Sequence, residues 1–142
     1  MQLEFSADWA VRVLLYLAAT GKLTPSSELS ARLGINKNSL LTIGRKMKKS
    51  GLVHVEQGPF GGYILARRPE EITVHDILTA FDSNLKFSAL EGLPYEAALA
   101  ADGFYTEIED NVTQMLKSKT LADLLREWSS DVSVSIKEAR EA

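Results

Sequence analysis

The chain opens with apolar residues at helical spacing. They predict a first helix from Ser6, its N-cap, to about Ala19, with Gly21 as the residue that ends it. The apolar positions on one face of this helix are Trp9, Val13, Tyr16 and Leu17. One face of the helix is therefore predicted to be buried.

Two shorter helices are predicted next. The pair Thr24-Pro25 offers an N-cap and a proline at the first helical position of SSELSARL, which Gly34 ends. Asn36 can cap a third helix, KNSLLTIGRKMKK, which Gly51 closes. Its apolar face has the spacing i, i+3, i+4, i+7 and consists of Leu40, Ile43, Gly44 and Met47. Its opposite face, which either meets solvent or reads a ligand, presents Asn38, Ser39, Leu41, Thr42, Arg45, Lys46 and Lys49.

A β-hairpin follows the third helix. The runs LVHVEQ and GYILARR are rich in β-forming residues, and GPFG separates them. Thr73 then caps a fourth helix that reaches about Phe81. The pattern is least regular over residues 82–102, where we expect a loop with a short helix that begins near Pro94.

The C-terminal part is predicted to be helical. One amphipathic helix carries Phe104, Ile108, Val112, Met115 and Leu116 on its apolar face. Thr120 and Asp123 have the spacing of a capping box that opens another helix around Leu121, Leu124, Leu125 and Trp128. The stripe of Phe104, Ile108, Val112 and Met115 has little chain left to cover it, so we expect it to form a homodimer contact.

The order of these elements is typical of a winged helix-turn-helix. Two short helices joined by LGINK, the second with a basic exposed face, precede a hairpin with glycines at its tip. The predicted fold class is therefore mainly α with a small β-hairpin wing, followed by a long C-terminal helix. The third helix would enter the major groove of DNA.

Composition adds a division of charge to this picture. The 142 residues have a formal net charge of −3 and are 45% apolar, which suits one functional unit. Up to Arg68 there are ten basic and four acidic side chains, a net charge of +6, whereas from Pro69 onward there are six and fifteen, a net charge of −9. A basic half joined to an acidic half is typical of a polyanion binder with an appended region, although an uneven surface charge is the plainer alternative.

The sequence offers little evidence for an enzyme or for a metal site. Cysteine is absent, which excludes thiolate nucleophiles, disulfides and cysteine-held zinc or iron–sulfur sites. His54 and His75 have no second ligand at metal spacing, and the chain has no phosphate-binding loop, dinucleotide fingerprint or nucleophile motif. We predict a protein that is not an enzyme and holds no cofactor. No long apolar run is present, so we expect a cytoplasmic protein without a membrane partner.

The third helix divides into two kinds of DNA contact. Side chains near the N-terminus of this helix, most of which carry directional hydrogen-bonding groups, are expected to reach base edges: Lys37, Asn38, Ser39 and Thr42. Arg45, Lys46 and Lys49 lie further along and are expected to bind phosphate, because a flexible charge suits that task. Leu41 either contacts a thymine methyl group or packs on a neighbouring helix.

The hairpin tip has the properties of a DNA-binding wing. Its glycines permit positive φ and a close backbone approach, and its proline removes a donor and stiffens the turn. The exposed amides can lie against phosphates or in a narrow minor groove. The segment expected at the DNA consists of Gln57, Gly58, Pro59, Phe60 and Gly61. A tight turn with no ligand is the alternative.

The segment SGLVHVEQGPFGGYILARRPEEITVHDILTAFD, together with the opening SADWAVRVLLYLA, resembles the Rrf2 family of bacterial transcription regulators over about residues 1–82. The family includes an iron–sulfur cluster regulator, a nitric-oxide-sensitive repressor and a cysteine-metabolism repressor. The resemblance implies a sequence-specific DNA-binding regulator, expected to be a repressor. It also implies a homodimer whose long helix after Asp102 pairs with its mate and sets the distance between two wings on a palindromic operator.

The same resemblance implies a division of the chain. Residues 1–68 would form the winged helix-turn-helix DNA-binding domain, residues 69–82 a connecting helix, and residues 83–142 an effector loop with a helical dimerisation region. The effector would be a small molecule or a partner protein, if there is one. A ligand cavity in this part of the family fold would be lined here by Trp9, Phe87 and Tyr95.

The chain departs from the family at two places. Cluster-binding members carry three cysteines in a loop where this chain has Leu90, Glu96 and Asp102, so no conventional cluster can be held. Where many members have a wing arginine, this chain has Gln57, which lacks the charge and the fork geometry. A winged-helix interaction module that has lost sequence-specific DNA binding is therefore the alternative function.

Overall fold

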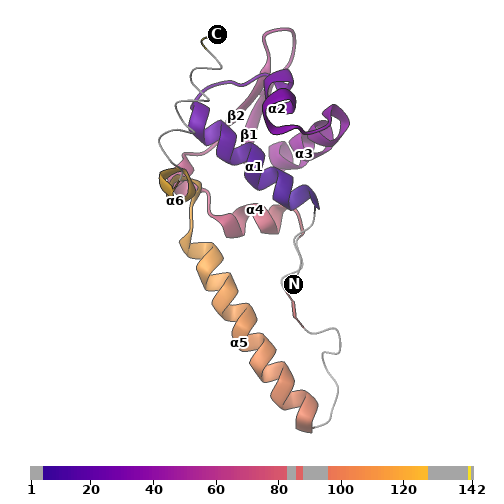
Figure 1. Ribbon diagram of the computed structural model, residues 1–142, viewed down its shortest axis with the longest axis vertical. Helices are drawn as coiled ribbons and strands as arrows, with labels where there is room; N and C mark the ends of the chain where they lie inside the picture. Colours follow the sequence, from indigo (N-terminus) through magenta and orange to yellow (C-terminus); the bar gives the residue numbers. More distant parts are fainter. Residues whose placement is uncertain (1–4, 83–85, 88–95, 128–140, 142) are drawn as a thin grey trace.

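The computed structural model describes residues 5–82, 86–87, 96–127 and 141. This part of the chain is mainly helical with one two-stranded antiparallel sheet, so the predicted fold class is confirmed. In chain order the elements are α1 (Phe5–Thr20), α2 (Ser26–Leu33), α3 (Lys37–Lys49), β1 (Val53–Glu56), β2 (Gly62–Leu65), the 3-10 turn η1 (Pro69–Glu71), α4 (Val74–Ala80), α5 (Glu96–Ser118) and α6 (Leu121–Glu127). Figure 1 shows a compact group of elements from which α5 extends; we call α1–α4, the hairpin and α6 the body.

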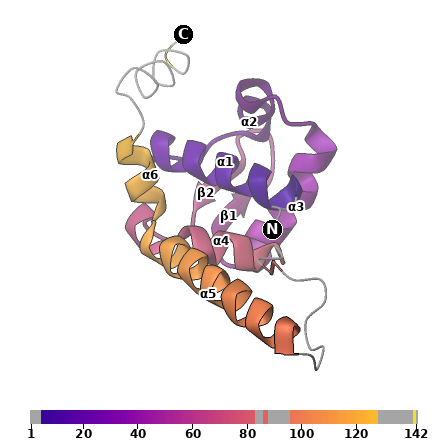
Figure 2. The same cartoon turned by 60° about the horizontal axis from the view of Figure 1, so that its bottom comes forward.

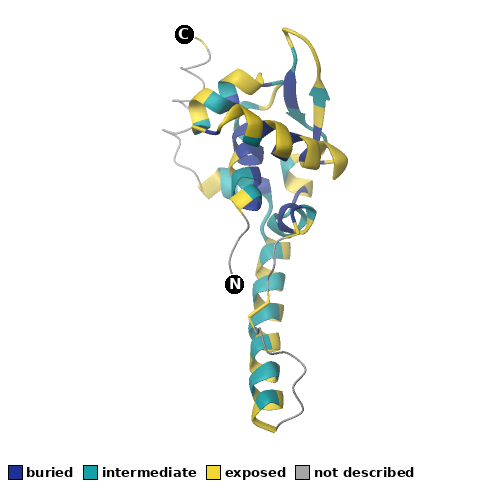
Figure 3. Ribbon diagram, turned by 90° about the vertical axis from the view of Figure 1, so that its right-hand side faces the viewer, coloured by how far each residue is buried: buried dark blue, intermediate teal, exposed yellow. Residues whose placement is uncertain are grey.

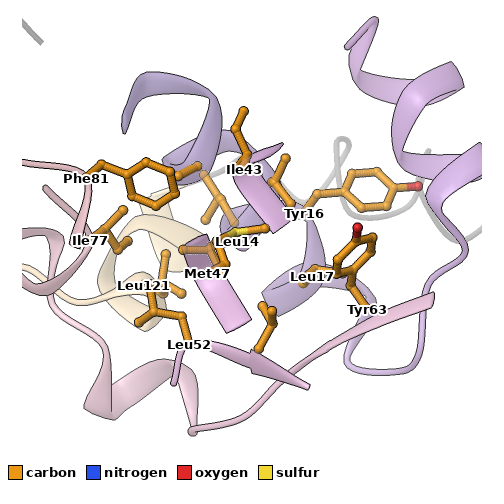
Figure 4. Close-up of a cluster of buried hydrophobic side chains, with 14 of the residues drawn as sticks. Leu14, Tyr16, Leu17, Ile43, Met47, Leu52, Tyr63, Ile77, Phe81 and Leu121 are labelled. Carbon is orange, nitrogen blue, oxygen red and sulfur yellow. The ribbon is translucent and has the colours of Figure 1, made fainter. Parts of the chain in front are cut away.

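Helix α1 runs through the centre of the body. Eight of its residues between Ala7 and Ala18 are buried, although Phe5 at its start is exposed, and α3, α4, α6 and the hairpin surround it. In Figure 4, Leu14 of α1 meets Met47 of α3 and Leu121 of α6 in one cluster of buried side chains. All three side chains are fully removed from solvent. This cluster supplies the apolar burial that stabilises the body.

Three helix starts follow the sequence prediction. The Asn36 side chain accepts hydrogen bonds from the N–H groups of Asn38 (2.7 Å) and Ser39 (3.4 Å) at the start of α3. Thr73 and Asp76 form a reciprocal capping box at α4. Thr120 and Asp123 form a second box at α6, with N···O distances of 2.9 and 3.1 Å. Each cap satisfies amides that the first helical turn leaves without partners.

Two predicted caps are wrong. Ser6 lies inside α1, because Phe5 is already helical. Thr24 is not the N-cap of α2; Pro25 holds that position and makes no side-chain cap. Thr24 is instead fully buried and pairs with Tyr63 of β2 through two backbone hydrogen bonds of 2.8 and 2.9 Å. Its hydroxyl donates to the Lys22 carbonyl (2.9 Å), so both its backbone and its side chain are used by contacts outside α2.

The hairpin lies close to where it was predicted. Its second strand packs tightly against the backbone at Thr24. β1 and β2 pair from Val53 opposite Leu65 to Glu56 opposite Gly62. Gly62 has a φ of +155°, and a Cβ atom there would lie 2.2 Å from the Thr24 carbonyl oxygen. Only glycine fits at this close approach of two backbones. The hairpin is thereby held against the start of α2.

Helix α5 starts earlier in the chain than predicted. It begins at Glu96 and continues without a break to Ser118, so residues 96–102 belong to it and not to a loop with a separate short helix. Gly103 lies within it without ending it. Pro94, where the short helix was expected to begin, and Trp128 at the far end of α6 lie outside the described residues. None of the residues of α5 is buried, as Figure 3 shows.

The C-terminal end of α5 is tied to the body by a small antiparallel contact. Thr73 and Thr120 form an isolated β-bridge. The Val74 N–H donates to the Lys119 carbonyl (2.8 Å), and the Leu121 N–H donates to the Ile72 carbonyl (2.9 Å). The two capped helix starts, α4 and α6, therefore lie directly beside each other. No helix in the described ranges is long and apolar enough to cross a membrane.

Candidate nucleic-acid interface

The exposed face of α3 is polar and positively charged. Asn38, Thr42, Arg45 and Lys49 are exposed and lie four, three and four residues apart, which places them along one line of the helix. We call these four residues the reading face. The opposite line is buried in the core, as the periodicity predicts. No acidic residue occurs between positions 37 and 50, so nothing within the helix offsets its charge.

The residues at the start of α3 differ in what they can still bind. The Thr42 hydroxyl donates to the Asn38 carbonyl (3.1 Å), which leaves its oxygen as an acceptor. Ser39 is half-buried on the flank and lines a hollow of about 240 Å³ beside Phe5 at the start of α1. Figure 2 shows this end of α1 close to α3. Lys37 is fully open to solvent at the first helical position. Asn38 and Lys37 are thus the more accessible of the predicted base contacts.

Lys46 lies on the other flank of α3. Its Nζ atom is 5.5 Å from the centre of the Phe81 ring at the end of α4, within the range of a cation–π contact. Phe81 itself is buried, so the lysine stem follows the seam between α3 and α4. Arg45 and Lys49 point from the reading face instead. The three predicted phosphate-binding residues are therefore not equivalent.

A groove joins α3 to the hairpin and to the start of α2. It has a volume of about 240 Å³ and contains Leu41, the hairpin tip and the first two residues of α2, Ser26 and Ser27. Leu41 is 49% exposed in this groove. The amides at the start of α2 have no side-chain cap, and such amides attract anions. Ser26 and Ser27 were missed by the sequence reasoning; the pair of serines after Pro25 was the available signal.

The hairpin tip projects next to α2 (Figure 1), and most of its residues line this groove. Gln57, Gly58, Pro59 and Phe60 are exposed, and Gly61 is half-buried. The Gly61 N–H donates to the Gly58 carbonyl (3.0 Å), which closes a four-residue turn. The predicted wing segment therefore forms a compact, accessible turn.

Tyr63 connects the hairpin to α3. Its ring is buried and its hydroxyl lies against Gly44, where an added Cβ would be 2.5 Å from the Tyr63 Oη atom. Burial raises the pKa of the Tyr63 phenol, and the charge of Arg45 partly opposes this shift. A side chain at position 44 would force the two elements apart. The hairpin and the reading face are thus held in a fixed relation.

The residues of the predicted effector cavity are only partly placed. Trp9 is half-buried and meets the Phe5 ring edge-on at 6.2 Å. Phe87 is exposed, and its N–H donates to the Glu109 carboxylate of α5 (2.6 Å). Tyr95 lies outside the described residues. The cavity stays a prediction.

The predicted dimerisation stripe lies along α5. Phe104 is 59% and Met115 63% exposed, while Ile108 and Val112 are half-buried. The apolar positions Ala98, Ala101, Tyr105, Ile108, Val112 and Met115 alternate at three and four residues. This is the spacing of a helix that packs along another helix.

A cysteine-held metal cluster does not fit this chain. The sequence contains no cysteine. Glu96 and Asp102 both lie on α5, and Leu90 lies outside the described residues. Within the described part of the chain, no group of three or more His, Cys, Asp or Glu side chains is arranged to hold a metal ion.

Comparison with known proteins places this geometry among transcription factors. The model of the Rrf2 family, described as iron-dependent transcriptional regulators, matches residues 3–127. Rv1287 of Mycobacterium tuberculosis strain H37Rv, named as an HTH-type transcriptional regulator, is 30% identical over 130 residues, which cover 87% of this chain and 81% of the relative. The HTH-type transcriptional regulator IscR of Pectobacterium atrosepticum is 28% identical over 132 residues, which cover 88% and 79%. These relatives are regulators and not enzymes, in agreement with the prediction.

Solved structures share the fold. CymR, the global cysteine regulator of B. subtilis, superposes with a TM-score of 0.79 at 22% identity, over 91% of this chain and 99% of that chain. IscR of T. potens gives a TM-score of 0.73 at 24% identity, over 89% of this chain and 88% of that chain. The predicted winged helix-turn-helix fold with its long helix is thereby confirmed.

Proposed function

Because the chain belongs to the Rrf2 family of transcriptional regulators, we propose that it is a homodimeric repressor that binds a palindromic DNA operator without an iron–sulfur cluster. The observation that carries the proposal is the reading face of α3, which is exposed, basic and held beside the hairpin by the contact of Tyr63 with Gly44. Since the proposed ligand is chromosomal DNA, we propose that the protein works in the cytoplasm.

The proposed contacts follow from the chemistry of each side chain. Asn38 and Thr42 carry directional groups near the start of α3 and would read base edges in the major groove. Arg45 and Lys49 would bind phosphates on either side of these bases. The amides of Ser26 and Ser27 would bind a further phosphate, because the first turn of a helix has unpaired donors.

The hairpin and Leu41 would complete the interface. We propose that the turn from Gln57 to Gly61 lies at the minor groove next to the site of α3. Leu41 faces the groove between α3 and the hairpin and is half-exposed there, which supports a contact with a thymine methyl group in preference to packing on another helix. Lys46 would reach a phosphate only on leaving the Phe81 ring.

The homodimer is supported by the state of α5. Helix α5 contacts α4 and packs Leu116 against the core, but it fully buries none of its 23 residues and exposes Phe104 and Met115, so part of its apolar surface has no packing partner within the described residues. A second copy of α5 against the same stripe would supply it. The proposed division is DNA binding by residues 1–68, connection by residues 69–82, and effector sensing with dimerisation by residues 83–142. A small molecule or a partner protein is the proposed effector.

The alternative is a winged-helix interaction module without sequence-specific DNA binding. The neutral Gln57 at the hairpin and the net charge of −3 favour it. The two functions differ in their dependence on salt, because only DNA binding releases many counterions from a polyanion. Binding that persists at high salt and needs no DNA would favour the module.

The test uses fluorescence anisotropy with duplexes selected by the protein from a random library and with scrambled duplexes, at several salt concentrations. We expect Asn38→Ala to lose about tenfold or more in affinity for the selected duplex and little for the scrambled one. Arg45→Ala should weaken both duplexes alike and reduce the salt slope by about one. If neither variant changes binding, the DNA-binding proposal fails.

A further inference from the structure

Phe60 is the most exposed large apolar side chain in the described part of the chain. Its ring is 92% exposed at the tip of the hairpin. A phenyl ring exposed to water lacks the favourable free energy that burial of its apolar surface would give. A single exposed apolar side chain is ordinary on a protein surface; what points to a ligand here is the place of the ring, at the hairpin tip beside the proposed DNA-binding surface.

The turn holds Phe60 outward. The hydrogen bond from Gly61 to Gly58 makes Pro59 and Phe60 the two central residues of a β-turn, whose side chains point away from the strands. Pro59 fixes its own φ and stiffens the turn. The short strands behind it are held by the pairing of Tyr63 with Thr24. The ring is thus carried on a narrow support that has little freedom to fold back.

The hairpin has no cation with which to bind phosphate. Between Val53 and Ala66 there is neither lysine nor arginine, and the exposed Glu56 carries a negative charge at the end of β1. The usual attraction between a wing and the DNA backbone is therefore missing here. A contact made by this hairpin has to rely on backbone amides and on the Phe60 ring.

A flat protein interface is the less suitable ligand. Such interfaces bury several hundred Å² on each partner, with aromatic residues surrounded by further apolar surface. The neighbours of Phe60 at the tip are Gln57, Gly58, Pro59 and Gly61, which offer little of it. A single ring on a thin turn fits a narrow groove, and apolar rings inserted between base pairs of the minor groove are a known means of bending DNA.

We propose that Phe60 acts as an apolar wedge in the DNA minor groove beside the bases contacted by α3, and that it selects sites with a pyrimidine–purine step at that place. Such steps unstack most easily, so the ring enters them with the smallest distortion energy. Sequence is then read at the hairpin through deformability and not through hydrogen bonds. This inference rests on the proposed DNA binding and adds a specificity-determining residue to it.

The test compares duplexes selected from one random-sequence library by the wild-type protein, Phe60→Ala, Phe60→Leu and the control Arg45→Ala. The wild type should enrich TA or CA/TG at a fixed distance from the bases read by α3. Phe60→Ala should lose this enrichment alone, with an affinity about tenfold lower for the wild-type site, while Phe60→Leu keeps part of it and Arg45→Ala keeps all of it. Because Phe60 makes no buried contact, equal urea unfolding curves confirm that the variants are folded.

A second measurement reads the wedge directly. With 2-aminopurine placed at the enriched step, binding of the wild-type protein should raise the fluorescence through unstacking, and binding of Phe60→Ala should not. A selected site whose step preference survives Phe60→Ala, or that shows no step preference with the wild type, overturns the wedge and leaves the DNA-binding proposal intact. If the wild type binds no duplex, the proposed function itself fails, and the wedge with it.

Discussion

Helices α1 and α5 are the two longest helices in the described part of the chain, and they stand in opposite relations to the rest of it. α1 spans 16 residues and buries eight of them, including its whole circumference from Val13 to Ala18. α5 spans 23 residues and buries none of them. The first is stabilised mainly by packing within its own chain, whereas the second leaves Phe104 and Met115 exposed and Ile108 and Val112 half-buried. The body thus packs within one copy of the chain, and the proposed homodimer would cover the exposed part of α5.

The same two regions differ in charge. The exposed side of α3 in the body is basic, while α5 carries Glu96, Asp102, Glu107, Glu109 and Asp110 against Lys117. An acidic helix is repelled by DNA, so α5 would stay off the DNA while the reading face approaches it. The proposed regulator, which would bind DNA with one part and its own copy with the other, would be served by this separation.

The largest effect is expected from a charge in the α5 stripe. Val112→Glu should raise the dissociation constant of the homodimer by at least about a hundredfold, since two-fold symmetry places two uncompensated carboxylates in the interface. Thr106→Glu, which adds the same charge to an exposed position off the stripe, is the control. Sedimentation velocity across a concentration series checks both. Equal dissociation constants for the two variants would contradict the proposed interface.

The next largest effect is on stability, and it should differ in sign between two glycines that both lie inside helices. Gly44→Ala should lower the free energy of unfolding by about 2 kcal/mol, because its Cβ meets the buried Tyr63 ring at 2.5–2.9 Å and overpacks the core. Gly103→Ala in α5 meets nothing within 4 Å and should gain up to about 1 kcal/mol from helix propensity. Urea unfolding of both variants gives the comparison. The same sign for both would mean that α5 is not the open helix described here.

A smaller effect distinguishes the lysines of the two regions. Lys49→Ala on the reading face should reduce the salt slope of DNA binding by about one and weaken binding several-fold at moderate salt. Lys117→Ala at the end of α5 should leave the slope unchanged, since the charge lies outside the interface. Anisotropy titrations at four or more salt concentrations measure both slopes. A change caused by Lys117→Ala would place DNA on α5 as well.

The smallest effect is a dependence on pH at the junction of the two regions. Hydrogen bonds from the Thr120 backbone and side chain lower the pKa of Asp123 below its ordinary value of 3.8. A lowered pKa means that the carboxylate stabilises the fold above pH 3.8 and that this contribution is lost as the pH falls through the folded-state value. The protection factors of the amides in the first turn of α6, which account for the slower intrinsic exchange in acid, should therefore fall as the pH falls. Asp123→Asn should abolish this dependence; an Asp123 titration at or above 3.8, followed by NMR, would contradict it.

Local signals made most of the body predictable. The caps at Asn36 and Thr73, the buried face of α3 and the turn at Gly58–Gly61 all depend on residues within a few positions of each other. Such features are encoded in short stretches of sequence, so periodicity and capping rules find them. The winged helix-turn-helix order followed from placing these stretches in a row.

One error came from a contact between distant positions. Thr24 has the residue type of an N-cap, but its pairing with Tyr63, 39 positions later, removes it from the helix. The contact of Lys46 with Phe81 also joins two helices that no local pattern relates, and the predicted role of Lys46 at DNA stays a prediction. The start of α5 was missed for a local reason: the alanines at positions 97, 98, 100 and 101 give a weak apolar pattern although they favour a helix. For the site, the reading face could be predicted from the sequence. The pair Ser26 and Ser27 after Pro25 was a weaker signal, because only the groove they share with the hairpin shows that they lie beside it.

The bridge between Thr73 and Thr120 limits how far α5 can tilt against the body, and this tilt would matter in the proposed homodimer. It is where the far end of α5 leaves the body, and two backbone hydrogen bonds of 2.8 and 2.9 Å fix its direction there. A helix of 23 residues is about 35 Å long, so a turn of about 10° at this end displaces the other end by about 6 Å. That displacement approaches two base-pair steps along DNA, whose rise is about 3.4 Å. In the proposed homodimer, the two hydrogen bonds at this bridge would determine how narrowly the distance between the two DNA-binding parts is fixed. They would thereby determine which spacing of operator half-sites the protein can bind.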